Sequence, residues 1–471
     1  MKWSSYILCL LLSLSLEFDC AAQELLQAAS QAQQILTTDY QQLGSVDGTG
    51  TCGSLLEGLD DEHLSGVSSG SRAKKCPSDA GDVSARSSGD FCRNPSAEVC
   101  KKANVAPYAR ALRNYRRSIR RIRGRFNLAT LTDPAITTIS RQINQARARG
   151  DTAQAQRLKV EMDIKSWQVA NSSLSTEFKK SKYGESQAQT VFASVQTALK
   201  SAIDKTSLSA QAKRLAKAKM DAQKLVLPSD VLQESSTYRS TMMDSIFACG
   251  DRIACLRNVN QDASDVKALS YLALKLFCGQ EMQLDGAVRI PGRGLLLCPG
   301  QVVAAKNSNR LNEMLSYTIG HELGHNLTHA AGGCGQHANG TPNMQQYFAQ
   351  TQSCFATDTG TFNCTVASSA ACRADVAQKM SELSSDIWGS MALAERVSGL
   401  SSSAARAYVS KAMIITACKN QLQKARGPVK SRGAGHSYTC GYHRLLVVTG
   451  QKFLSTATNC GSALPRACST E

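Results

Sequence analysis

Long apolar runs and acidic residues are the two features in which this chain is poor. Beyond residue 20 no stretch approaches eighteen consecutive apolar residues, which excludes a polytopic membrane protein. The 37 Asp and Glu stand against 54 Lys and Arg and leave a formal charge of +17, which favours contact with anionic surfaces or acidic substrates. With 42% hydrophobic and 19% charged residues the chain is neither collagen-like nor wholly disordered, and its 471 residues suit two or three domains.

The cysteines also lack a familiar pattern. None of the 18 has the C-x-x-C spacing of zinc ribbons, so we interpret them as disulfide partners in an oxidising compartment. Lys2, the apolar stretch from Tyr6 to Leu16 and the small residues before Gln23 predict a signal peptide over residues 1–22. A lipoprotein is the alternative because Cys20 follows the apolar stretch, but residues 17–19 are not the small ones that lipidation needs. We therefore expect a secreted, periplasmic or cell-surface protein without a transmembrane anchor.

Three regions follow along the chain. Residues 23–104 are rich in Gly, Ser and Asp after a short Gln/Ala-rich helix, and their cysteines predict a loop-rich region held by disulfides. Residues 105–245 have few glycines and apolar residues at three-to-four spacing, which predicts helices through about residue 226. Residues 246–471 hold most of the histidines.

A basic stretch lies at the start of the helical region. Residues 101–125 contain ten Lys or Arg and no acid. This predicts either an anion-binding face for phosphate-rich polymers or lipid headgroups, or, as the simpler alternative, a solvated helix face paired with acids elsewhere. Aromatic residues are few here, so we expect no specific nucleic acid partner.

The pattern H-E-x-x-H occurs at residues 321–325, within a region that holds six of the seven histidines. Apolar residues recur around it with helical period, and His321 and His325, four apart on one face, can reach the same zinc ion. Glu322 lies beside them, where a carboxylate can take a proton from water. The alternative is a surface helix with two ordinary histidines.

A third ligand is needed to complete a zinc site. The metzincin pattern requires Gly at 328 and a ligand at 331, where this chain has Thr328 and Ala331. His329 is swung by about 80° around the helix from the first histidine, so we interpret it as structural. His337 lies in a Gly- and Cys-rich loop and is a weak candidate.

A second helical pattern, from about residue 374 to 399, offers a better ligand. Glu382 and Asp386 are four apart on it. One carboxylate can bind zinc while the other accepts the ring N–H of a histidine ligand. We therefore predict that His321, His325 and Glu382 hold Zn²⁺ with water in the fourth position, and that Asp386 orients a histidine.

With these residues in place, the sequence resembles the gluzincin peptidases, most closely the neprilysin-like family. The run from Gly286 to Pro299 is similar to that family's substrate-binding motif and the edge strand after it. The resemblance implies a mainly helical (α+β) protein in which residues 246–471 form a thermolysin- or neprilysin-like catalytic domain with a small edge sheet. It also implies main-chain pairing of a peptide substrate with the edge strand.

Residues near the carboxyl terminus extend the resemblance. His436 and Arg444 are similar to the family's oxyanion-stabilising histidine and substrate-binding arginine, with His443 as the alternative histidine. Cys460 and Cys468 are similar to its terminal cysteine pair. The four cysteines between residues 332 and 372 predict a disulfide-tied insertion between the two zinc helices.

The sequence thus predicts an exported zinc metalloendopeptidase acting on a peptide or protein, with Glu322 as general base. One alternative is an amidase of cell-wall peptide cross-links, which would use the same residues. The other is a non-catalytic surface-binding protein with a structural zinc site, which would need four protein ligands rather than three.

Overall fold

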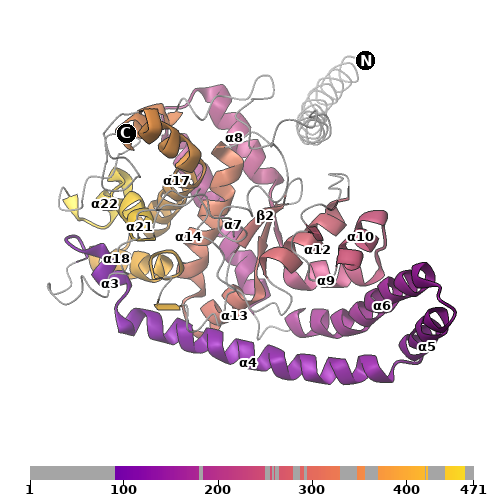
Figure 1. Ribbon diagram of the computed structural model, residues 1–471. Helices are drawn as coiled ribbons and strands as arrows, with labels where there is room; N and C mark the ends of the chain where they lie inside the picture. The colour runs from indigo at the N-terminus through magenta and orange to yellow at the C-terminus, as the bar shows by residue number, and fades with distance from the viewer. Residues whose placement is uncertain are drawn as a thin grey trace, which may run out of the picture.

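The computed structural model describes residues 91–179, 184–249, 255–256, 259, 265–278, 287–290, 294–328, 347–355, 370–418, 421–422 and 441–461. Helices dominate these residues, which confirms the expected mainly helical fold (Figure 1). The predicted signal peptide and most of the loop-rich region lie outside them. No helix in the described part of the chain combines the length and apolarity needed to cross a bilayer.

The elements are grouped here in chain order. The first group is α3 (Pro95–Val99), α4 (Lys102–Thr132), α5 (Pro134–Ala148) and α6 (Thr152–Lys179). The second is α7 (Glu185–Lys205), α8 (Ala210–Ala222), α9 (Pro228–Thr237), α10 (Thr241–Cys249) and α12 (Val266–Phe277). The third is α13 (Pro299–Asn307), α14 (Leu311–Thr328), α16 (Ala349–Phe355) and α17 (Ala370–Val397). The last is α18 (Ser402–Ala412), α19 (Ile414–Ala417), α21 (Gly441–Thr449) and α22 (Lys452–Ala457).

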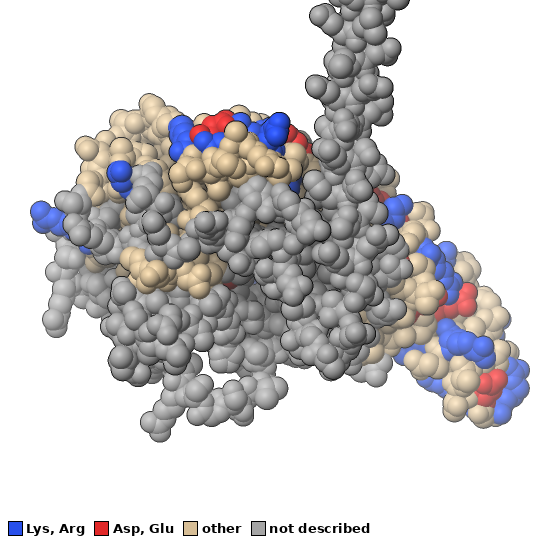
Figure 2. All heavy atoms as spheres, turned by 90° about the horizontal axis from the view of Figure 1, so that it is seen from above, with Lys and Arg blue, Asp and Glu red and all other residues tan. Residues whose placement is uncertain are grey.

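Helices α4, α5 and α6 form the part that we call the arm. In Figure 1, α4 runs along one side of the molecule, and α5 and α6 turn back at its far end. Asp133 separates α4 from α5, accepts the N–H groups of Ala135 and Ile136, and so caps α5. Asp151 likewise accepts the N–H of Gln154 near the start of α6. Figure 2 shows Lys and Arg over the projecting end of the arm with few acids among them.

The sheet has three described strands, β1 (Lys224–Val226), β2 (Ala287–Ile290) and β3 (Gly294–Leu297). Their order is β1-β3-β2; β3 pairs parallel with β1 and antiparallel with β2. Two expectations were therefore wrong in detail. Helix does not continue to residue 226, because residues 224–226 pair with β3 instead. The strand at the end of the family-like run, β3, is central, and the two edges of the described sheet are β1 and β2.

Three apolar clusters make up the core. The arm core joins α4 and α6 to α9, α10 and α12, and includes Tyr115, Ile119, Ile164, Leu232, Met243, Ile246 and Leu272. The metal-centre core joins α7, α14 and α17, and includes Val195, Leu199, Leu315, Ile319, Leu323, Leu383, Ile387 and Trp388. The terminal core joins α3 and the start of α4 to α18, α19 and α21, and includes Val99, Tyr108, Leu112, Val409, Ile414, Leu445 and Val448.

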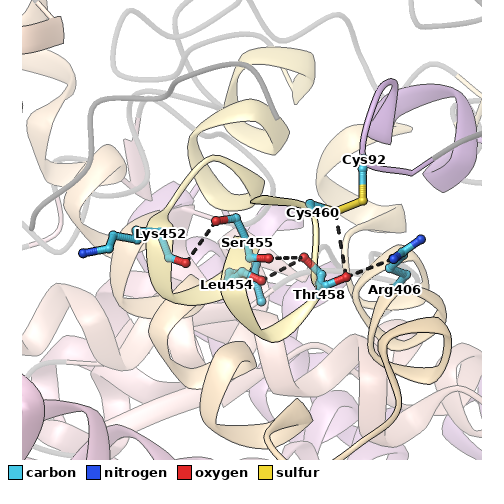
Figure 3. The surroundings of a disulfide bond; sticks show 7 residues. All are labelled: Cys92, Arg406, Lys452, Leu454, Ser455, Thr458 and Cys460. Atoms are coloured by element: carbon cyan, nitrogen blue, oxygen red, sulfur yellow. Dashed lines mark hydrogen bonds between the residues drawn. A yellow bond between two sulfur atoms is a disulfide. The ribbon is translucent and has the colours of Figure 1, made fainter. Parts of the chain in front are cut away.

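Two disulfides flank α3 and bind it to the carboxyl-terminal part of the chain. Cys92 pairs with Cys460 across 368 residues (Figure 3). Cys100 pairs with Cys418 across 318 residues. The expected pairing of Cys460 with Cys468 was therefore wrong, because the partner of Cys460 comes from the other end of the described chain. Since residues 418 and 460 lie on either side of α21, the two bonds fasten the segment that carries this helix. Such bonds are consistent with an oxidising compartment.

Two further disulfides close short loops. Cys249 pairs with Cys255, and Cys278 pairs with Cys298, at sequence separations of 6 and 20 residues. All four of these cysteines belong to or pack against the arm core.

Candidate metal centre

Helices α14 and α17 pack against each other and bring the predicted ligands together. His321 and His325 lie one helical turn apart on α14, and Glu382 lies on α17. The apolar residues of both helices are buried in the metal-centre core. This packing holds α14 and α17 in the position that brings their ligand residues together. Together the two histidines and the glutamate form a group that could hold a metal ion.

The ligand atoms face one another at short range. Nε2 of His321 lies 3.2 Å from Nε2 of His325 and 3.1 Å from Oε2 of Glu382. Nε2 of His325 lies 3.4 Å from Oε1 of the same carboxylate. Ligands at about 2.0–2.2 Å from a tetrahedral zinc lie about 3.4 Å from one another, so the spacing suits such an ion.

The state of Glu382 also fits a metal. Its Oε2 is buried and has no hydrogen-bond partner, although a histidine nitrogen lies near it. An unsatisfied buried carboxylate oxygen is costly, and a cation between the three side chains would compensate it. Two nitrogens and a carboxylate oxygen are the donor set that zinc prefers in catalytic sites.

Asp386 lies beneath the ligands and is fully buried. Its Oδ1 lies 2.9 Å from Nδ1 of His321, which favours the tautomer that leaves Nε2 free for a metal. Arg444, from α21, donates from Nε and Nη2 to both oxygens of Asp386 at 2.9 and 2.7 Å. The hydroxyl of Tyr317 donates to Oδ1 of Asp386 at 2.5 Å. The orientation of His321 therefore depends on three helices, α14, α17 and α21.

The electrostatics of the site favour a cation. Burial alone would lower the pKa of His321, but the neighbouring carboxylates of Asp386 and Glu382 raise it to about 9. Burial alone would raise the pKa of Glu382, but the charges of His325 and His321 lower it to about 2. Against the same effect of burial, Arg444 holds the pKa of Asp386 well below its ordinary value. Positive charge between the imidazoles and the carboxylates is thus strongly stabilised.

Glu322 follows His321 on α14 and is half-buried, as His325 is. Burial raises its pKa to about 7, and the charges of His321 and Glu382 act on it as well. A carboxyl group that titrates near neutrality can both accept and return a proton.

Several other predicted residues lie outside the part of the chain that the structure describes. These are His436, His329, His337 and Gly286. Most of the expected insertion also lies outside it, and residues 347–355 and 370–372 of the insertion are described. His443 belongs to α21, which also carries Arg444, but its side chain is outside the described part. Among the described residues, the structure brings together His321, Glu322, His325, Glu382, Asp386 and Arg444.

Two features of the site were missed. Tyr317 precedes His321 by one turn, a position that one sequence does not distinguish from an ordinary core tyrosine. Gly320 and Gly324 form a G-x-x-x-G spacing that signals close helix approach. A Cβ at Gly320 would lie 2.9 Å from Cβ of Ala392, and one at Gly324 would lie 2.8 Å from Cβ of Trp388. The absence of both side chains lets α17 approach α14 closely enough for its carboxylates to reach the histidines.

Comparisons of this chain with protein-family models, with curated proteins and with solved structures found no match. The resemblance to neprilysin-like peptidases therefore depends on the motif residues alone.

Proposed function

We propose that this protein is a zinc-dependent metallopeptidase that is exported and hydrolyses peptide bonds. The observation that carries the proposal is the convergence of His321, His325 and Glu382, from two helices, on one buried point with Glu322 beside it. Structural zinc sites are usually closed by four protein ligands, whereas the described residues supply three. The disulfides agree with an oxidising compartment outside the cytosol.

His321, His325 and Glu382 would hold the metal. A zinc ion bound there would supply a Lewis acid that acidifies water and polarises a carbonyl group. Glu322 would act as general base by taking the proton of the attacking water, and then as general acid by returning it to the leaving amine. A pKa of about 7 lets its carboxylate serve in both directions.

Positioning falls to the residues behind the ligands. Asp386 holds His321 through Nδ1, and Tyr317 and Arg444 hold Asp386. Arg444 uses two of its guanidinium nitrogens, Nε and Nη2, to hold the carboxylate of Asp386. For the developing oxyanion we retain His436, with Arg444 beside it, as a prediction.

The substrate backbone would add to the sheet at β2. Among the described strands β2 pairs only with β3, and it also contacts α14, the helix of the two histidines. An extended peptide could therefore pair with main-chain groups along this edge near the metal.

The test is cleavage of a peptide library by the full mature chain, read by mass spectrometry, with Glu322→Gln and Glu382→Ala alongside. We expect Glu322→Gln to keep one zinc per chain and to lose about 100- to 10,000-fold in rate. Glu382→Ala should lose both zinc and activity, because it removes a ligand.

The outcomes separate the alternatives. A Glu322→Gln variant as active as the parent would sink the mechanism. Cleavage confined to cell-wall cross-link peptides would indicate the amidase. Stoichiometric zinc with no cleavage of either kind would indicate the non-catalytic binding protein.

A further inference from the structure

Much of the positive charge of the chain is concentrated in the arm and the residue before it. Residues 101–165 contain sixteen Lys or Arg and four Asp or Glu, so they carry +12 of the formal +17. Of the four acids, Asp133 and Asp151 cap helices and Asp163 pairs with Lys159. Three of the four acids in this region therefore already have partners of their own.

The buried face of α4 fixes the direction of its arginines. Tyr108 and Leu112 pack into the terminal core, while Tyr115 and Ile119 pack into the arm core. These residues recur every three or four positions and so define one side of the helix. Side chains on the opposite side must point to solvent.

Five arginines occupy that opposite side, and we call them the arginine stripe: Arg110, Arg113, Arg117, Arg120 and Arg121. All five are exposed, and none has an ion pair with an acidic residue in the part of the chain that the structure describes. At 1.5 Å per residue the stripe extends over about 17 Å. The simpler alternative, a basic face neutralised by acids elsewhere in the fold, gains no support from these contacts.

The arginine side chains of the stripe favour a partner that carries phosphate groups. Arginine presents a planar fork that binds a phosphate through two hydrogen bonds. A helix that binds a membrane lays an apolar face into the lipid, but the apolar face of α4 is buried in protein. The large hydrophobic residue that is exposed among the described residues is Leu400, which is not on the arm. A lipid surface is therefore the less suitable partner.

We propose that the arginine stripe of α4 binds the phosphodiester backbone of a linear polyanion without reading its sequence. The two tyrosines of this part of α4, Tyr108 and Tyr115, are buried, so neither offers its ring for base stacking. Contacts to backbone phosphates alone give affinity and position but no sequence preference. This property is independent of the peptidase site.

The experiment measures binding of the full mature chain to a fluorescent oligothymidylate by anisotropy across a range of salt concentrations. Arg113→Gln/Arg117→Gln/Arg120→Gln removes three charges from the stripe. Each lost phosphate contact should reduce the log–log salt slope by about 0.7, so we expect a slope smaller by about 2 and an affinity lower by on the order of 100-fold near 0.1 M salt.

A matched control removes the same charge elsewhere on the arm. Arg141 and Arg147 on α5 and Arg157 on α6 are also exposed. Their triple change to Gln should leave the affinity within about threefold and the slope unchanged. Thermal unfolding of both variants checks that each is folded.

Three results would overturn the proposal. One is an equal loss in the control variant, which would make net charge rather than the stripe responsible. Another is no binding of the parent chain even at low salt. The third is binding to vesicles that contain phosphatidylserine without binding to the oligonucleotide, which would make lipid headgroups the partner.

Discussion

The metal centre and the arm are both helical, but they place charge in opposite ways. At the metal centre Asp386 and Glu382 are buried, and each lies against cationic or histidine side chains from other helices. On the arm most of the described charged residues are exposed, and the ion pair of Lys159 with Asp163 lies within about one turn of a single helix. Burial turns a few charges into a specific site, whereas exposure leaves many charges available to a partner.

The two regions also differ in how far apart in sequence their partners lie. Helices α5 and α6 follow each other directly and pack together, as consecutive helices usually do. Helices α14 and α17 are separated by the predicted insertion, and Arg444 comes from still further along the chain. The metal centre therefore depends on long-range contacts that the arm does not need.

The disulfides give the largest test of this difference. Cys100→Ser/Cys418→Ser removes a bond between residues 318 apart at the terminal core. Because the Cys92–Cys460 bond still links the two ends, the loop that opens is effectively about 50 residues long, and the free energy of unfolding should fall by about 4 kcal/mol. Cys249→Ser/Cys255→Ser opens a loop of 6 residues at the arm core and should cost about 2 kcal/mol. Urea unfolding followed by circular dichroism measures both, and equal losses would contradict the distinction between long-range and local support.

The hydroxyl of Tyr317 gives a smaller and more specific test. Tyr317→Phe removes one hydrogen bond to the buried carboxylate of Asp386, which should cost about 2 kcal/mol of stability. Because Asp386 orients His321, zinc affinity should fall by about 10- to 100-fold, measured by competition with a chromophoric chelator.

The matched control is Tyr408→Phe. The Tyr408 hydroxyl also hydrogen-bonds to α14, at Asn312 O and Ser316 Oγ, but it lies away from the ligands. The Tyr408→Phe substitution should lower the free energy of unfolding without changing zinc affinity. A Tyr317→Phe chain that binds zinc like the parent would show that Arg444 alone fixes Asp386.

The sequence predicts the metal centre better than it predicts the surrounding fold, for a physical reason. Histidines and carboxylates at helical spacing must share a face, so His321, His325, Glu382 and Asp386 could be found from the H-E-x-x-H pattern combined with helical spacing. The distant segments that support the site could not be predicted. Nothing in the sequence around Cys460 indicates that its disulfide partner is Cys92 rather than Cys468.

The short strands show the same limit. Residues 224–226 have only their pairing with β3 to make them a strand, and that partner lies about 70 residues away. The preceding helical pattern was therefore extended one turn too far. The outward direction of the arginines on α4 was likewise undefined until the opposite face was known to be buried.

The smallest effect is expected from the ion pair between Lys159 and Asp163 on α6. Both side chains are partly exposed, and their nitrogen and oxygen lie 2.9 Å apart at i, i+4 spacing. A double-mutant cycle with Lys159→Gln and Asp163→Asn should give a coupling of about 0.3–0.5 kcal/mol, and less in high salt, because water and ions screen exposed charges. Breaking the buried pair of Asp386 and Arg444 should instead cost about 3–5 kcal/mol, since the remaining charge would be left without compensation. An equally strong coupling in the exposed pair would show that solvent does not screen the charges of the arm. It would then contradict the contrast between the arm and the metal centre.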